Sequence, residues 1–123
     1  MLAKDPNSNF VLDRLELDTK TGLMYCAECE DVYLDVLDEY LNDDKRSELN
    51  EFFETQNWER YRISAHSVKS SSLTIGATDL YDIARQIEEP LKDMDFSPAL
   101  RLHSELIDKY TEVLEMLSRE LNK

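Results

Sequence analysis

Apolar side chains recur every three or four positions along most of this 123-residue chain, and little interrupts that pattern. The sequence contains only two glycines and three prolines, the residues that most often break helices. The C-terminal segment shows the pattern clearly, in a stripe made up of Leu102, Leu106, Tyr110, Val113, Leu117 and Leu121. This period is typical of amphipathic α-helices and not of strands. The sequence therefore predicts an all-α fold.

The expected helices cover residues 28–55, 58–75, 79–91 and 98–121, and the first region is either one bent helix or two. Residues typical of helix ends stand at these borders: Asn57, Gly76, Thr78, and Ser97 with Pro98. Short connections make neighbouring helices antiparallel, so we predict an antiparallel four-helix bundle over residues 18–123. A short helix, capped by Asp18 or Thr19 and ended by Gly22, is expected at its start. Residues 1–17 are expected to form an N-terminal leader and packing segment.

The formal net charge of −13 restricts the partners of the chain. Nucleic acid would be repelled by this charge, so no nucleic-acid partner is expected. No apolar run approaches the roughly 20 residues that span a bilayer, and no signal peptide is visible. We therefore expect a soluble, cytoplasmic domain with no membrane segment, unless it is cut from a longer membrane-anchored protein.

Cys26 and Cys29 form a C-x-x-C pair. A structural zinc site needs about four ligands, and the sequence contains no second pair. A redox-active pair would stand beside a strand, and no strand pattern is present. We therefore expect neither a metal site nor a redox site here. Cys29 is expected to pack on a helix face, with Cys26 at the entry to that helix.

The segment 58–75 carries the most informative polar residue, His66. On a helical wheel the buried stripe of this segment consists of Tyr61, Ala65, Val68, Ser72 and Ile75. His66 projects away from that stripe, and its neighbours are Arg62, Ile63, Lys69, Ser70 and Leu73. A neutral, exposed imidazole is a nucleophile that another protein can reach. Lys69 lies one turn further along and can neutralise phosphate oxygens, and the small Ser70 permits close approach.

The spacing of residues around His66 resembles the motif of histidine-containing phosphotransfer (HPt) domains. The matching positions are Lys69 at +3, Ser71 at +5, Gly76 at +10, Ala77, and Leu80 at +14. The resemblance extends from about Gly22 to the C-terminus, and its specific motif covers residues 65–80. The family often has glycine at +4, where this chain has Ser70, which is also a small residue. The resemblance implies that His66 is the phosphoacceptor and that Lys69 lies beside the phosphate, while Ser71 and Gly76 provide close approach and the turn.

Two further polar residues, Glu88 and His103, are candidates for a role at or beside this site. Folding the chain back at the turn near Ala77 brings residue 88 level with residue 66, so Glu88 can orient one ring nitrogen of His66. Glu88 could equally be a solvated surface residue. His103 lies near the edge of an apolar stripe and lacks a lysine at +3, so we expect a packed, hydrogen-bonded histidine there and not a second phosphoacceptor.

The resemblance implies a phosphocarrier that receives a phosphoryl group from one receiver-domain aspartate and passes it to another. The receiver supplies Mg²⁺, so we expect no cofactor on this chain and no kinase activity of its own. The expected partners are response-regulator receiver domains, with a hybrid sensor kinase as a further candidate. Ile63 and Leu73 are expected at the centre of the docking surface, with Arg62 at its rim. One complete bundle per chain favours a monomer.

Two other classes of function remain open. The dimerising, histidine-bearing hairpin of a sensor kinase usually has an acidic residue directly after the histidine, and here Ser67 follows. A helical interaction module with an inert surface histidine would account for the bundle and the charge, but not for the spacing around His66. Incubation with a phosphorylated receiver would distinguish these classes.

Overall fold

The structure, a computed structural model, describes residues 11–122, and all the regular secondary structure in that range is helical. After a helical segment at residues 11–14, its helices are α2 (Thr19–Tyr25), α3 (Glu30–Asn42), α4 (Arg46–Glu54), α5 (Trp58–Ile75), α6 (Thr78–Leu91) and α7 (Ser97–Glu120). The predicted all-α class is confirmed. Of the leader and packing segment predicted for residues 1–17, residues 1–10 lie outside the described residues.

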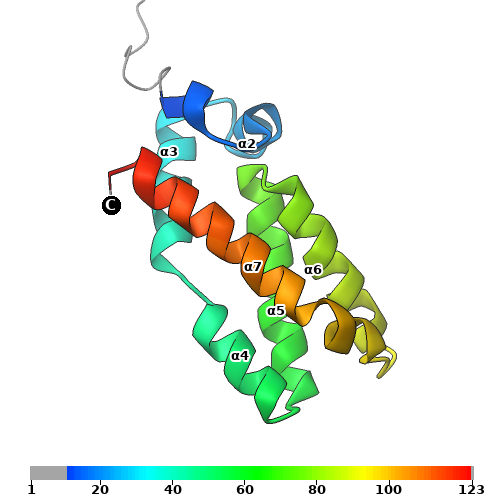
Figure 1. Cartoon of the computed structure of the whole chain (residues 1–123). Coiled ribbons are helices and arrows are strands. Elements are labelled where there is room, and N and C mark those ends of the chain that lie inside the picture. The colour runs from blue at the N-terminus through cyan, green and yellow to red at the C-terminus, as the bar shows by residue number, and fades with distance from the viewer. Residues whose placement is uncertain (1–10, 123) are drawn as a thin grey trace, which may run out of the picture.

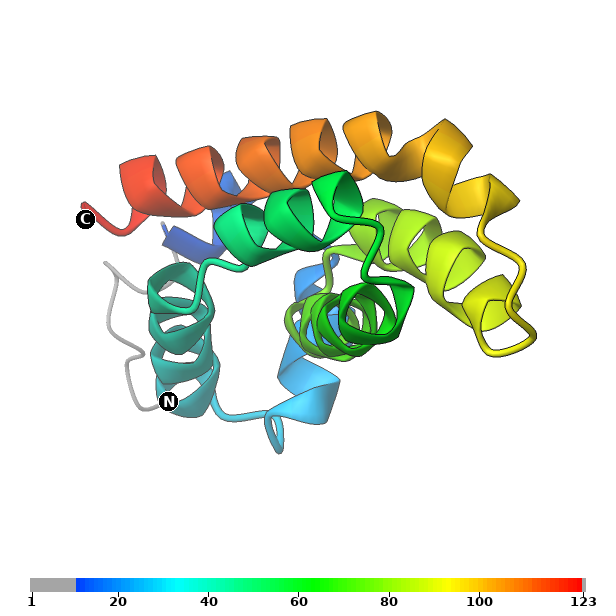
Figure 2. The same cartoon turned by 90° about the horizontal axis from the view of Figure 1, so that it is seen from below.

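The helices form a bundle in which α5 packs against α6, α7 packs against α6, and the successive helices α3 and α4 complete the fourth side (Figure 1). Figure 2 shows α7 running along one side of the molecule, next to α4 and α6. The region 28–55 forms two helices, separated at residues 43–45. Residues before the bundle also pack on it, because Leu15 is buried in the same core and Arg14 pairs with Glu120.

The turn between α5 and α6 is set by Gly76, as the sequence predicts. Gly76 has a φ of +85° and ends α5 in the left-handed conformation that glycine adopts most readily. Its carbonyl oxygen accepts a hydrogen bond from the Asp18 backbone N–H at 2.8 Å, and a Cβ at this position would collide with the Asp18 carbonyl oxygen. The tight turn therefore folds α6 directly back along α5.

The caps of the helices differ in part from the predictions. Asn57 caps α5 as predicted, and its side chain accepts a hydrogen bond from the Arg60 backbone N–H. Thr78 and Ser97 are the first residues of α6 and α7 and not their caps, which are Ala77 and Phe96. Ala77 and Phe96 make no side-chain capping hydrogen bond, because their side chains contain no oxygen.

The prediction that Gly22 ends a short helix is wrong. Asp18 caps α2 through a hydrogen bond from the Thr21 backbone N–H, and the helix continues past Gly22 to Tyr25. Gly22 is buried against Tyr33, and a Cβ there would lie only 2.5 Å from a carbon of the Tyr33 ring. The glycine is therefore needed for close packing of α2 on α3 and not for a chain reversal.

The two cysteines are placed the opposite way round from the prediction. Cys26 follows α2 and is buried in the core, whereas Cys29 caps the N-terminus of α3 and is exposed. Val32 on α3 is also exposed, although it is apolar. The chain turns at Ala27 and Glu28, both with positive φ, and this turn sets the rotation of α3. Local periodicity could not predict that rotation.

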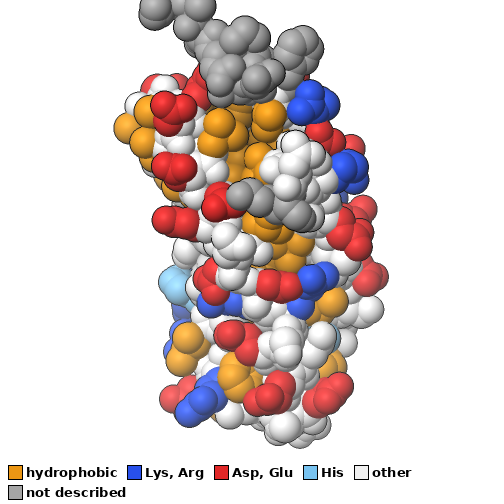
Figure 3. Space-filling view, turned by 90° about the vertical axis from the view of Figure 1, so that its left-hand side faces the viewer, with side chains coloured by type: hydrophobic (Ala, Val, Ile, Leu, Met, Phe, Trp, Pro, Cys, Tyr) orange, Lys and Arg blue, Asp and Glu red, His pale blue; other side chains and the backbone are white. Residues whose placement is uncertain are grey.

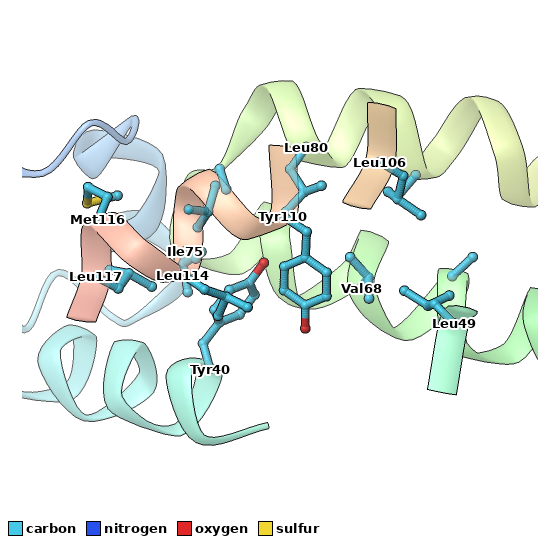
Figure 4. Close-up of a cluster of buried hydrophobic side chains, with 14 of the residues drawn as sticks. Tyr40, Leu49, Val68, Ile75, Leu80, Leu106, Tyr110, Leu114, Met116 and Leu117 are labelled. Atoms are coloured by element: carbon cyan, nitrogen blue, oxygen red, sulfur yellow. The ribbon is translucent and has the colours of Figure 1, made fainter. Parts of the chain in front are cut away.

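The core confirms the predicted buried stripe of α5. Its five members, Tyr61, Ala65, Val68, Ser72 and Ile75, are each at most 1% exposed. Figure 4 shows several of the core side chains, among them Tyr40 from α3 and Tyr110 from α7, whose ring centroids lie 6.0 Å apart. The Tyr40 hydroxyl also forms a hydrogen bond with Ser72 at 2.9 Å. These contacts fix the rotation of α5 and thereby the direction of its opposite face.

Candidate functional site

His66 lies on the face of α5 that points away from the core. Its side chain is 56% exposed, so the ring meets solvent although its helix is central to the bundle. Ile63 and Ser70 on the same helix are exposed, whereas Arg62, Lys69 and Leu73 are half-buried. The predicted neighbours of His66 are therefore all partly or fully accessible around it.

Glu88 on α6 holds one nitrogen of the His66 ring. Its side chain is 0% exposed, and its Oε1 lies 2.6 Å from His66 Nδ1. An ionised carboxylate can only accept hydrogen bonds, so Nδ1 carries the proton and donates it. The other nitrogen, Nε2, then keeps its lone pair, and the accessible ring presents it for reaction. Counting back from the turn predicted that these residues lie level, but it left the burial of Glu88 open.

Two lysines surround the same carboxylate. Lys69 Nζ lies 3.3 Å from Oε1 of Glu88, and Lys92 Nζ lies 3.6 Å from Oε2. Burial by itself raises the pKa of Glu88, but the hydrogen bond from His66 and the charges of Lys69 and Lys92 together lower it by more than burial raises it. The pKa of Glu88 therefore lies below its ordinary value, and Glu88 stays ionised at neutral pH.

Lys92 was not among the residues predicted from the sequence. It lies four residues after Glu88, at the C-cap of α6, and side chains with this spacing face each other on a helix. That spacing was a usable signal once Glu88 had been singled out. The predicted helix 79–91 stops just before Lys92, whereas in the structure Lys92 is the C-cap of α6 and keeps helical backbone angles, with φ −60° and ψ −29°.

The serines near His66 have different surroundings. Ser70 is exposed one turn after His66, so no bulky side chain stands at that position. Ser71 is half-buried, and its hydroxyl donates to the Ser67 carbonyl oxygen of its own helix at 2.9 Å. Ser71 thus lies beside the reactive face and makes no contact with His66 among the hydrogen bonds of the described residues.

A groove of about 510 Å³ lies along α5 and α6 on the N-terminal side of His66. Arg62 and Lys92 line it together with apolar residues from both helices and from the connection to α7: Trp58, Leu91, Met94 and Phe96. Glu59 completes the lining. Because Arg62 is one turn from His66 and Lys92 pairs with Glu88, the groove opens next to the reactive ring.

His103 is packed and hydrogen-bonded, as the sequence predicts. Its Nδ1 lies 2.8 Å from the Tyr61 hydroxyl and its Nε2 lies 2.8 Å from Oδ1 of Asn50. The ring also stacks on Phe53 at a centroid distance of 4.0 Å. Both nitrogens are used, so His103 offers no free lone pair to a phosphoryl group.

Among the described residues, no group of three or more His, Cys, Asp or Glu side chains is arranged to hold a metal ion. Likewise, none of the helices in residues 11–122 has the length and apolar character needed to cross a membrane.

The family of the chain follows from comparison of its sequence with known families. The family model of the Hpt domain matches residues 24–122, which is most of the chain, so the chain belongs to the Hpt domain family. Hpt domains are phosphocarriers of two-component signal transduction and interact with receiver domains. No curated protein and no solved structure matches the chain.

Proposed function

We propose that His66 carries the phosphoryl group and exchanges it with aspartates of receiver domains in a two-component phosphorelay. The observation that carries this proposal is the contact between His66 Nδ1 and the buried Glu88 carboxylate at 2.6 Å. It fixes the tautomer in which Nε2 is the nucleophile, on a ring that is more than half exposed. His103, with both nitrogens engaged, lacks these properties.

In the proposed transfer, the lone pair of His66 Nε2 forms a bond to phosphorus. The bond between phosphorus and the receiver aspartate breaks, and its electron pair leaves with the aspartate carboxylate. The phosphorylated ring then carries a positive charge, which the ionised Glu88 stabilises through the proton on Nδ1. The reverse reaction returns the phosphoryl group to an aspartate, so one site can both accept and donate.

Lys69 and Ser70 have supporting roles in this proposal. Lys69 lies one turn after His66 and can contact the phosphoryl oxygens as a point charge. The exposed and small Ser70 leaves room for the receiver to approach. Mg²⁺ would come from the acidic pocket of the receiver, with no cofactor on this chain.

We further propose that receivers dock on the surface around His66 formed by Arg62, Ile63, Ser70 and Leu73. Ile63 is 57% exposed, which gives this surface an apolar contact next to the reactive ring. Acidic and basic side chains are interspersed over the face of the molecule that Figure 3 shows, and acidic ones predominate in the chain. Since the receiver pocket is acidic as well, apolar burial should supply much of the affinity.

The test is phosphoryl transfer from a labelled, phosphorylated receiver to this chain. The wild-type protein should acquire label that is acid-labile and alkali-stable, whereas His66→Gln should acquire none and keep its helical circular dichroism. His103→Gln is the matched control and should still be labelled. Label that persists in His66→Gln, or that disappears only in His103→Gln, would refute the assignment.

A helical interaction module with an inert histidine is the alternative. It would bind receivers or other proteins with no transfer of label, and His66→Gln would then behave as the wild type does. We also propose that the domain is a cytoplasmic monomer, which sedimentation of the purified protein and its localisation in cells would test.

A further inference from the structure

The second carboxylate oxygen of Glu88 has an unusual environment. Among the described residues, Oε2 is buried and has no hydrogen-bond partner, although Oε1 of the same group accepts from two donors. Lys92 Nζ lies 3.6 Å from Oε2 and pairs with it as an ion pair. A buried charge without a close partner is costly, so the contact with Lys92 matters more than its length suggests.

Lys69 cannot serve Glu88 and a phosphoryl group equally well. Its Nζ lies 3.3 Å from Oε1, and its side chain is 16% exposed, so in the unphosphorylated protein it lies against Glu88. A phosphoryl group on Nε2 of His66 brings a charge of about −1.5 to −2 and three strong acceptor oxygens. That group competes with Glu88 for the ammonium group of Lys69.

Moving Lys69 toward the phosphoryl group would leave Glu88 short of positive charge at the moment when it must be ionised. Lys92 is the residue that can compensate, because it approaches the other oxygen and lies at the C-cap of the helix that carries Glu88. Its side chain is 54% exposed, so it can adjust its position without rearranging the core.

We propose that Lys92 is a positioning residue that keeps Glu88 ionised while Lys69 turns to the phosphoryl group. Lys92 does not touch the phosphoryl group in this arrangement and acts through Glu88 alone. The inference rests on the proposed function of His66, since it assigns Lys69 to the phosphoryl group and Lys92 to the Glu88 carboxylate.

The experiment measures the equilibrium of phosphoryl exchange between this chain and a phosphorylated receiver. Lys92→Gln should shift the equilibrium toward the phosphorylated receiver by about threefold to tenfold, the size expected for one charge acting on a partly buried site. Arg85→Gln is the matched control, because Arg85 lies on the same helix and pairs only with Asp82 and Glu89 among the described residues. It removes the same charge and should change the equilibrium less than twofold.

A double variant distinguishes action through Glu88 from direct contact with phosphate. In a Glu88→Gln background there is no buried charge to balance, so adding Lys92→Gln should have no further effect on the equilibrium. A Lys92 effect of undiminished size in that background would overturn the inference, as would wild-type exchange in Lys92→Gln itself. Absence of label on His66 in the wild type would instead refute the proposed function.

A second measurement does not depend on the Glu88→Gln variant folding. The carboxyl carbon of Glu88 can be followed by NMR as the pH is lowered in the wild type, Lys92→Gln and Arg85→Gln. Loss of the Lys92 charge should raise the pH at which Glu88 takes up a proton, whereas Arg85→Gln should leave it unchanged. Equal titration in all three proteins would contradict the inference.

Discussion

At the scale of single residues, the chemistry of the site depends on one oxygen atom of Glu88. Oε1 accepts from His66 Nδ1 and from Lys69 Nζ, so the tautomer of the histidine and the position of the lysine are set together. A carboxylate on the surface would be hydrated and would orient the ring weakly. Because Glu88 is buried, water does not compete for these contacts.

Replacing Lys69 by alanine should lower the rate of transfer or the lifetime of phosphohistidine by roughly tenfold, because one charge-assisted contact with the phosphoryl group is lost. Rapid quenching of labelled protein would measure both quantities. Lys109→Ala is a suitable control, since Lys109 lies on α7 and pairs with Asp79 and Glu112. Unchanged kinetics in Lys69→Ala would show that Lys69 only supports the helix surface.

At the scale of helices, α5 presents its exposed apolar residues unevenly. Ile63 is 57% exposed, whereas Leu73 is half-buried and therefore contributes to the fold as well as to the surface. Ile63 is the cleaner probe of docking for this reason.

Truncation of Ile63 to alanine should weaken binding of an unphosphorylated receiver by about 1–2 kcal/mol, in the range of typical interface truncations. The thermal midpoint of unfolding should change little, because the side chain is mostly in water. Leu100→Ala is the matched control, since Leu100 is 55% exposed on α7. If both variants bind the receiver as the wild type does, the docking surface lies elsewhere; titration calorimetry would measure the affinities.

The packing of α2 on α3 depends on Gly22. Alanine is better than glycine inside a helix by about 1 kcal/mol, but its Cβ would lie 2.5–2.8 Å from three atoms of the Tyr33 side chain. Tyr33 cannot move freely, because its hydroxyl donates to the Ile75 carbonyl oxygen at 2.7 Å. Gly22→Ala should therefore lower the free energy of unfolding by about 1–2 kcal/mol, as overpacking typically does.

Urea denaturation would measure this change, with Lys20→Ala as the control at an exposed position of the same helix. Stabilisation by Gly22→Ala would mean that α2 can shift away from α3 without loss.

At the scale of the whole molecule, His103 connects three helices. Asn50 belongs to α4, Tyr61 to α5 and His103 to α7, and the two hydrogen bonds between them are both 2.8 Å long. Oδ1 of Asn50 can only accept, so Nε2 of His103 donates and its Nδ1 accepts from the Tyr61 hydroxyl. This arrangement requires a neutral ring.

Burial lowers the pKa of His103, and the negative charge of Glu54 only partly opposes this effect. The unfolded chain takes up a proton on this histidine near its ordinary pKa of about 6.5. The free energy of unfolding should therefore fall as the pH drops below that value. The slope corresponds to at most one additional proton bound by the unfolded chain. The free energy of unfolding of His103→Gln, measured between pH 5 and 8, should vary less than that of the wild type. Parallel curves for the two proteins would contradict this expectation.

The helices and their buried faces follow from local information. The positions of apolar residues in 58–75 predicted the five core residues of α5 and, from them, the outward direction of His66. Gly76 likewise predicted the end of α5, because few other residues adopt its backbone conformation. The predictions failed where a neighbouring helix decided the outcome, as with Gly22, which looks like a helix end in the sequence but lies against Tyr33.

The sequence by itself determined the all-α class and the position of His66 on an exposed face. It also determined that residues 66 and 88 lie side by side on antiparallel helices. These features depend only on the helical period and on one turn. Only the tertiary structure decided that Glu88 is fully buried and that Lys92 approaches its second oxygen. It also decided that Cys26 and not Cys29 enters the core. The physical reason is that periodicity defines which face of a helix is apolar, whereas burial and contacts of a few ångströms depend on how neighbouring helices pack over that face.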